Sequence, residues 1–425
     1  MEIGKYSFGT GDRFAHQGES QLSALMQASK NLGIEIVPVW NKSNREHTIV
    51  HSTPADTRKE ADDAVKSLGY KGDYFVDADH INLTNVDKFI DDSDFFTLDV
   101  ADYIGKKAAQ ADIDAFVAAN QKYTGKLPIP GIAEPFDVPQ ELLVRITEKF
   151  LFAVQEAGKI YRHIEAVKGA GAFVAEVSMD EVNDAQSPVE MFFILSAIAG
   201  EKIPAQTIAP KFTGRFNKGV DYVGDVKQFA KEFEEDLLVI DFAIQQFGLP
   251  GNLKLSIHSG SDKFSIYPIM GTLIRKYDKG IHIKTAGTTW LEEMIGLAMS
   301  GDEEAIDLAK AIYTGALGRF DELCGPYATV IDIDKRKLPT SKDVERWTGA
   351  KLADTLRHHP GHPDFNPHFR QLIHVGYKVA SDYGVYFTDA LKTHKEIVGR
   401  QVFENIYNRH ILRLFATNKT DRKSQ

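Results

Sequence analysis

The stretch LKLSIHSGSDKFSIYP, residues 253–268, decides the fold prediction. It begins as a buried strand, with Leu253, Leu255 and Ile257 at alternate positions. Six polar or small residues, HSGSDK, follow directly, and an apolar run typical of a helix comes next. Folding alone does not require a histidine, two hydroxyls, an acid and a base at the end of one strand. Such an ending indicates a functional site if other strands of the chain end in the same way.

Seven other segments repeat this order of a short apolar strand followed by a helical pattern. Alternating strands and helices are typical of a parallel sheet, and eight such units predict a closed (β/α)8 TIM-type barrel. An open doubly wound sheet is the alternative, but GTGDRF and GAGAFV each match its phosphate-binding turn only in part. The other predicted strands cover residues 5–8, 34–40, 73–80, 95–100, 172–180, 206–212 and 280–287.

Two regions do not belong to a minimal barrel. Residues 106–170 contain a loop rich in Pro and Gly and a long helical pattern, which predicts a helical insertion after the fourth strand. The segment after residue 301 is mainly helical to the end of the chain. We therefore expect a catalytic barrel over residues 5–300, with the insertion at about 106–170, and a helical C-terminal extension over residues 301–425 packed on the barrel.

Composition limits the class of protein. The chain has 425 residues, a formal net charge of -10 and no basic stripe, which argues against a nucleic-acid partner. Its single cysteine, Cys324, excludes an internal disulfide. No secretory signal is visible, and no run approaches the roughly 18 apolar residues of a membrane span. We expect a soluble cytoplasmic protein that binds a small molecule and no membrane; the sequence leaves its oligomeric state open, a homo-oligomer included.

Histidines lie at the carboxyl ends of three predicted strands, where the residues of a barrel face one shared mouth. His80, His258 and His282 are therefore predicted to hold a divalent metal, with Zn, Mn, Ni, Co and Fe all compatible. Any one histidine alone is more often an ordinary core or surface residue. Their shared position in the barrel favours the metal site.

Carboxylates and basic residues surround these histidines. Asp79 and Glu176 are a candidate pair for removing and returning a proton, although they could instead be ligands or ion-pair partners. Positive charge for an acidic substrate would come from basic residues at the mouth, unless they form salt bridges with the neighbouring acids. Asp77 could also support the metal, and Ser259 could also cap the next helix. The predicted substrate-binding residues are Arg13, Asp77, Asp180, Ser259, Lys263 and Lys284.

Seven segments resemble the tagaturonate epimerase family, which also includes tagatose 4-epimerases. The resemblance runs from residue 7 to about residue 380 and implies a metal-dependent barrel enzyme that interconverts D-tagaturonate and D-fructuronate in hexuronate catabolism. It also implies that Asp79 accepts a proton, that Glu176 donates one, and that His80, His258 and His282 bind the metal. The segments are FGTGDR (8–13), DADH (77–80), EVSMDE (176–181), KGVDYVGD (218–225), LSIHSGSDKFSIYP (255–268), HIKTAGT (282–288) and QLIHVGY (371–377).

The two sugar acids differ at the hydroxyl-bearing carbon β to the ketone, whose hydrogen is not acidic. We therefore predict a retro-aldol route, which needs a base for the hydroxyl proton and a metal to stabilise the enediolate. Migration of the ketone by enediol steps is the alternative, and no dinucleotide fingerprint indicates a bound NAD. The residues alone also leave open a neutral ketohexose as substrate, another metal-dependent isomerase or aldolase, and a non-catalytic sugar-binding barrel.

Overall fold

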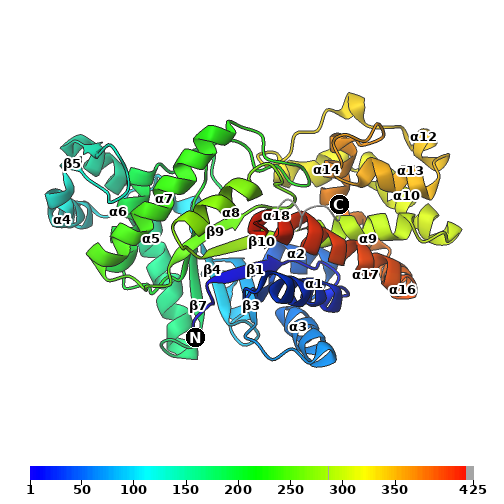
Figure 1. Ribbon diagram of the computed structural model, residues 1–425, viewed down its shortest axis with the longest axis horizontal. Helices are drawn as coiled ribbons and strands as arrows, with labels where there is room; N and C mark the ends of the chain where they lie inside the picture. Colours follow the sequence, from blue (N-terminus) through cyan, green and yellow to red (C-terminus); the bar gives the residue numbers. More distant parts are fainter. Residues whose placement is uncertain (286, 418–425) are drawn as a thin grey trace.

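Eight parallel strands close into a barrel in the computed structural model, which describes residues 1–285 and 287–417 (Figure 1). Their order around the barrel is β1-β10-β9-β8-β7-β4-β3-β2, with every pair of neighbours parallel. This confirms the predicted TIM-type barrel and excludes the alternative, an open doubly wound sheet. The strands are β1 Tyr6–Thr10, β2 Val37–Ser43, β3 Phe75–Ile81, β4 Phe95–Asp99, β7 Val174–Ser178, β8 Thr207–Ala209, β9 Lys254–His258 and β10 Ile281–Thr285.

Helices cover the outside of the barrel. The connection from β3 to β4 is the exception among the strand-to-strand links, because its helical element is a short 3-10 turn, Val86–Lys88. Within the described residues no helix is both long and apolar enough to cross a membrane. Besides α5 Gln140–Lys168, which precedes β7, the helices that precede or follow barrel strands are α1 Gly18–Leu32, α2 Asn44–Val50, α3 Pro54–Leu68, α6 Pro188–Gly200, α7 Val226–Phe247, α8 Tyr267–Lys276 and α9 Thr288–Ala298.

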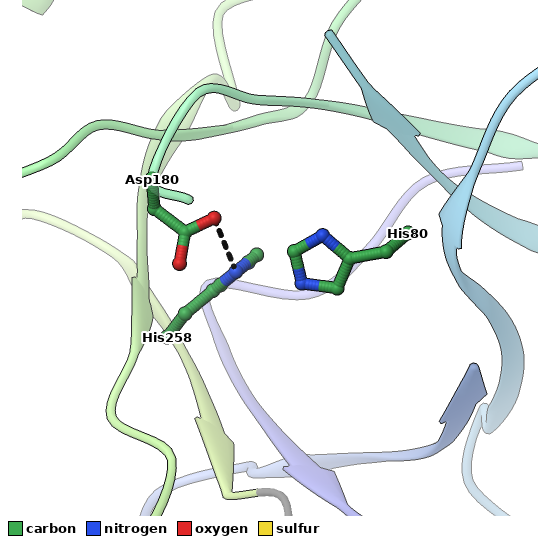
Figure 2. A group of neighbouring side chains, drawn as sticks. All are labelled: His80, Asp180 and His258. Atoms are coloured by element: carbon green, nitrogen blue, oxygen red, sulfur yellow. Dashed lines mark ion pairs between the residues drawn. The ribbon is translucent and has the colours of Figure 1, made fainter. Parts of the chain in front are cut away.

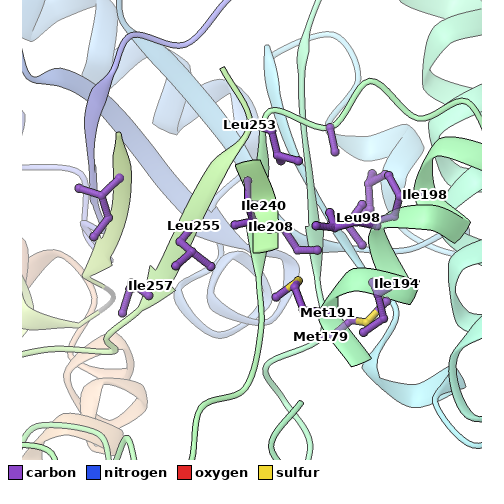
Figure 3. Close-up of a cluster of buried hydrophobic side chains, with 14 of the residues drawn as sticks. Leu98, Met179, Met191, Ile194, Ile198, Ile208, Ile240, Leu253, Leu255 and Ile257 are labelled. Carbon is purple, nitrogen blue, oxygen red and sulfur yellow. The ribbon is translucent and has the colours of Figure 1, made fainter. Parts of the chain in front are cut away.

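The main core lies between the strands and these helices. Successive side chains of a strand point to opposite faces, so Leu255 and Ile257 of β9 face outward. Figure 3 shows them in one layer with Ile208 of β8, Ile240 of α7 and Ile194 of α6. Full burial of such a side chain contributes about 1.5–3 kcal/mol to folding. Because of the same alternation, the polar side chains of the strands point into the barrel interior.

The barrel interior is apolar only at its floor. Val37, Val39, Phe75, Phe95 and Val174, together with Ile3, form a separate buried cluster there. The layer above it is polar and contains Asp77, Thr97, Glu176, Thr207 and His282, all of them buried. Bulky branched side chains usually fill this space in TIM barrels. A polar interior costs stability unless every group is paired, so packing alone does not account for it.

An insertion and a helical extension lie at opposite ends of the molecule (Figure 1). The insertion contains α4 Gln110–Asn120, the two-stranded sheet of β5 Gly125–Leu127 and β6 Phe136–Val138, and the 29-residue α5 Gln140–Lys168. Both the helical insertion and the helical C-terminal region were predicted, and both predictions are confirmed. The helices after residue 300 are α10 Glu303–Gly318, α11 Phe320–Cys324, α12 Ser341–Glu345, α13 Gly349–Leu356, α14 Pro367–Val375, α15 Tyr377–Asp382, α16 Val385–Thr393, α17 Lys395–Glu404, the π-helix Asn405–Ile411 and α18 Leu412–Phe415.

The C-terminal helices contact the barrel in two ways. A second core joins α9 to the extension and contains Trp290, Tyr313 and Phe369. Farther along the chain, Ile406 and Leu414 return to the main barrel core, where they pack near α1 and α8. The expected boundary between residues 300 and 301 stays a prediction, and α9 packs with the residues beyond it.

Candidate active site

A hollow of about 800 Å³, partly open solvent, lies at the carboxyl ends of the barrel strands. Strand-end residues of β2, β3, β9 and β10 line it together with residues from α2, from four loops and from the C-terminal extension. This is the mouth at which TIM barrels carry their active sites. Of the predicted site residues, those that line the hollow are Arg13, Asp79, His80, Asp180, His258 and Lys284.

A β-bulge turns His80 towards the hollow. In a regular strand Asp79 and His80 would point to opposite faces. The pairing of β3 with β4 shifts register between Ala78 and Ile81, and His80 has a φ of 51°, in the left-handed region. Bulges of this kind redirect side chains beside active sites. Both residues therefore line the same cavity.

His80, Asp180 and His258 come together at the mouth (Figure 2). The two imidazole rings are 5.1 Å apart between centroids, and His258 Nδ1 lies 3.2 Å from Asp180 Oδ1. Each of the three residues offers one potential ligand atom, and these three atoms all lie within 4.8 Å of one another. Two imidazoles and a carboxylate form a donor set that divalent transition metals bind. The group therefore fits the metal that the sequence predicts.

Neighbouring carboxylates hold the two imidazole rings in place. Asp99 Oδ2 lies 3.2 Å from His80 Nδ1, and Glu176 Oε1 lies 2.8 Å from His258 Nε2. Such contacts fix the orientation of metal-binding histidines. Burial lowers the pKa of His258, but Asp180 and Glu176 outweigh it and raise the pKa to about 9. The concentration of negative charge favours a cation at this position.

Lys284 links three carboxylates beside His80 and His258. Its Nζ lies 2.7 Å from Asp77 Oδ2, 2.8 Å from Asp79 Oδ1 and 3.0 Å from Glu176 Oε1. Gly9 on the neighbouring β1 leaves room for this long side chain, because a Cβ there would lie 3.0 Å from Lys284 Cγ. Burial opposes ionisation of Asp79, but Lys284, His80 and His258 together outweigh burial and lower the pKa to about 2. Asp79 therefore faces the cavity as a carboxylate.

His282 lies deeper in the barrel than the other two predicted ligands. It pairs with Ser256 of β9, whereas Lys284 pairs with His258, so His282 is one layer below the mouth. Its Nδ1 is 2.9 Å from Ser7 Oγ, and its Nε2 has no hydrogen-bond partner among the described residues. Burial lowers its pKa to about 3. The structure thus does not group His282 with the other two histidines, and Asp180 takes that place.

Several predicted substrate contacts have partners inside the protein. Arg13 Nε lies 3.1 Å from Glu46 Oε1, and its Nη1 donates to the His374 carbonyl at 2.7 Å. Lys263 Nζ donates to the Asn217 and Val220 carbonyls, and Ser259 Oγ donates to the Lys284 carbonyl at 2.7 Å. Asp77 is enclosed by Lys284 and Thr97. Neither Lys263, Ser259 nor Asp77 lines the hollow.

The polar residues at the end of β9 therefore mainly hold other segments in place. In HSGSDK only His258 and Gly260 line the hollow. Ser261 Oγ accepts a hydrogen bond from the Gly219 amide at 2.9 Å, and Asp262 pairs with Arg370 at 2.9 Å. His258 is the one side chain of this segment that enters the site. Ser261 and Asp262 instead hold the neighbouring loop and the C-terminal extension in place.

The hollow also contains residues that sequence reasoning missed. Lys211 follows β8 by two residues, so the strand-end rule applied to the other strands could have found it. Lys218 and Glu181 lie in segments that carried the family resemblance, which was the signal available for them. Tyr327 comes from the C-terminal extension, and no sequence pattern indicated it. Burial, with a smaller effect of Lys218, lowers the pKa of Lys211.

Comparisons with known proteins agree with this architecture. A curated tagaturonate/fructuronate epimerase of Thermotoga maritima is 28% identical over 383 residues, which are 87% of this chain and 72% of that protein. The crystal structure of a fructuronate-tagaturonate epimerase of Cohnella laeviribosi with one glycerol has a TM-score of 0.79 and 23% identity, covering 97% of this chain and 82% of that one. A second structure of that protein, with two glycerols, has a TM-score of 0.78 and 22% identity, covering 98% of this chain and 83% of that one. The tagaturonate epimerase family model matches residues 1–414, and this chain belongs to the tagaturonate epimerase family.

Proposed function

We propose that this enzyme interconverts D-tagaturonate and D-fructuronate with a divalent metal held by His80, His258 and Asp180. The observation that carries the proposal is the meeting of these three side chains beside the Asp79 carboxylate in one cavity. Family membership supports the choice of substrate, and the donor set supports the metal. A bound divalent cation would supply Lewis-acid stabilisation of negative charge on the substrate.

Asp79 is the base in this proposal. It is the carboxylate of the Lys284 cluster that lines the cavity, and its low pKa keeps it in the unprotonated form that a base requires. In a retro-aldol step Asp79 would take the proton of the hydroxyl β to the ketone. The bond between that carbon and its neighbour next to the ketone then breaks, leaving an aldehyde and an enediolate. Addition of the enediolate to the other face of the rotated aldehyde forms the same bond again and gives the epimer.

Glu176 is proposed to return the proton. It is fully buried and does not line the cavity, but it contacts the same ammonium as Asp79. Lys284 Nζ therefore joins the two carboxylates and connects the buried acid to the cavity. Thr207 Oγ1 donates to Glu176 Oε2 at 2.8 Å and fixes the carboxylate on its other side. Burial opposes ionisation of Glu176, but Lys284 and His258 hold its pKa well below the usual range, so Glu176 would act through the Lys284 ammonium. Lys284 would give a proton to the substrate oxygen and regain one from Asp79, which completes the cycle.

The course of the bond-breaking step can be tested in D2O with D-fructuronate. The retro-aldol route keeps the hydrogen of the epimerised carbon, so NMR of the product is expected to show no deuterium there. Trapping the aldehyde fragment with hydroxylamine during turnover would add direct support. Deuterium at the epimerised carbon of the product would overturn the retro-aldol route.

Removal of divalent metal is expected to abolish epimerisation. A chelator-treated protein should regain activity with one or more of Mn²⁺, Zn²⁺, Ni²⁺ and Co²⁺, because a Lewis acid stabilises the enediolate. NMR would follow conversion of D-fructuronate to its epimer. Full activity of protein shown by elemental analysis to be free of metal would contradict the prediction.

The ligand set with Asp180 can be distinguished from the three-histidine set by measuring bound metal in three variants. His258→Gln and Asp180→Asn are expected to lower metal occupancy, whereas His282→Gln should retain metal because that ring lies one layer deeper. Circular dichroism would show that each variant is folded. Loss of metal from folded His282→Gln with retention in Asp180→Asn would instead favour the three-histidine set.

A further inference from the structure

Three basic side chains of the hollow have no carboxylate within ion-pair distance in the described part of the chain. Arg45, Lys211 and Lys218 form no ion pair with any described residue, and their side chains make no hydrogen bond within residues 1–285 and 287–417. Their polar groups face aromatic rings or the cavity: the Arg45 guanidinium lies 4.9 Å from the centroid of Tyr327, and Lys211 Nζ lies 6.0 Å from that of Phe216.

The other cations of the hollow are already neutralised. Arg13 pairs with Glu46, and Lys284 contacts three carboxylates. The chain has 60 acidic and 50 basic residues, so partners for basic groups are abundant. A shortage of acidic residues therefore does not explain why these three cations, unpaired within the described residues, share one cavity. Such a group of positive charges suits an anionic ligand.

The loop that carries Lys211 and Lys218 is held firmly in place. The Lys218 amide donates to the Val330 carbonyl at 2.7 Å, and the Gly219 amide donates to Ser261 Oγ at 2.9 Å. Lys263 Nζ donates to the Val220 carbonyl at 2.8 Å. Both the end of β9 and the C-terminal extension thus fix this loop. A fixed loop reduces the entropy lost when its side chains bind a ligand.

Lys218 also lies close to the metal group. A Cβ at Gly260 would be 3.8 Å from Lys218 Nζ, and Gly260 follows His258 by two residues. A sugar whose reacting carbons lie beside Asp79 and His258 would reach this loop with its far end. In a hexuronate that end is a carboxylate, and in a ketohexose it is a hydroxymethyl group.

We propose that Lys211 and Lys218, with Arg45 at the rim, bind the substrate carboxylate and select a sugar acid over a neutral ketohexose. The proposal rests on the proposed epimerase function and specifies the chemistry of its substrate. Two ammonium groups supply point charges, and a guanidinium can bind a carboxylate with two hydrogen bonds.

The first test compares D-fructuronate with D-fructose as substrates of Lys211→Gln and Lys218→Gln. We expect kcat/KM for D-fructuronate to fall about 10- to 100-fold, mainly through KM, because a charge-assisted contact is lost. The value for D-fructose should stay unchanged, and Lys218→Arg should recover most of the loss. Lys227→Gln, on the exposed face of α7, is the matched control. Equal losses on both sugars, or no loss on either, would overturn the proposal.

The second test does not depend on turnover, so failure of the epimerase function would not obscure it. Calorimetry would compare binding of D-glucuronate, an acid without the ketone, with binding of D-glucose. The wild type should prefer the acid, and Lys211→Gln and Lys218→Gln should reduce that preference about tenfold or more. No preference in the wild type, or the same preference in folded variants, would show that these lysines do not select a carboxylate.

Discussion

Asp79→Asn is expected to lower kcat for D-fructuronate by about 10²- to 10⁴-fold, the usual contribution of a general base. The asparagine keeps the size of the side chain and removes its ability to accept a proton. Lys284 would retain two carboxylates, Asp77 and Glu176, so the buried cluster should remain charged and folded. The measurement is a steady-state assay followed by NMR, with kcat and KM determined separately.

Two controls separate a base from a metal ligand or a structural acid. Metal content should be unchanged in Asp79→Asn, because Asp79 belongs to none of the groups of described residues whose atoms are close enough to hold a metal. Asp102→Asn is the matched substitution, because Asp102 is an exposed acid just after β4 and outside the hollow. It should leave kcat unchanged. Wild-type kcat in a folded, metal-loaded Asp79→Asn protein would rule out Asp79 as the base.

Strand periodicity made the barrel predictable from the sequence. Leu255 and Ile257 alternate with polar residues on β9, and that period distinguishes the two faces of a strand. The same rule placed Asp79, His258 and Lys284 at one mouth, where the structure has them. Each of these predictions depends on residues close together in sequence, so local pattern was sufficient.

The depth of each residue in the barrel was not predictable. His282 and His258 both lie near the ends of apparent strands, and the sequence does not show how the two strands align. The register pairs His282 with Ser256, two residues before His258. Two residues of a strand span about 6.6 Å, which is enough to remove His282 from the group at the mouth. Register is set by packing between segments that are distant in the sequence, so it cannot be read from the residues around either strand.

Partners also determine what a polar residue does. Lys263 and Ser259 have the right chemistry for binding a sugar, but backbone carbonyls on other segments take their hydrogen bonds. The bulge that turns His80 into the cavity depends on a backbone conformation that few non-glycine residues adopt. Tyr327 enters from a helical extension whose docking no pattern revealed. Tertiary packing decides all of these contacts.

Asp262→Asn is expected to destabilise the protein by about 3–5 kcal/mol, the cost of leaving a buried charge without its partner. Asp262 and Arg370 are both completely buried, and Arg370 Nη2 lies 2.9 Å from Asp262 Oδ2. His358 Nδ1 lies 3.1 Å from the same oxygen, and His410 Nε2 lies 3.3 Å from the other. One carboxylate therefore connects the end of β9 with two distant parts of the extension. Chemical denaturation monitored by circular dichroism would give the free energy of unfolding.

The pH dependence of the Asp262 contribution provides a further check. Burial disfavours the charged carboxylate, but Arg370 and His358 hold the pKa of Asp262 well below its usual range. The stabilisation is thus complete above the pKa of an unfolded aspartate, about 4, and is lost as the pH falls below it. The gap between wild type and Asp262→Asn should narrow in acid. Asp321→Asn, an exposed partner of Lys335 in the extension, should change stability little at any pH. A gap that is absent at neutral pH would mean that the Asp262 carboxylate does not stabilise the packing of the extension on the barrel.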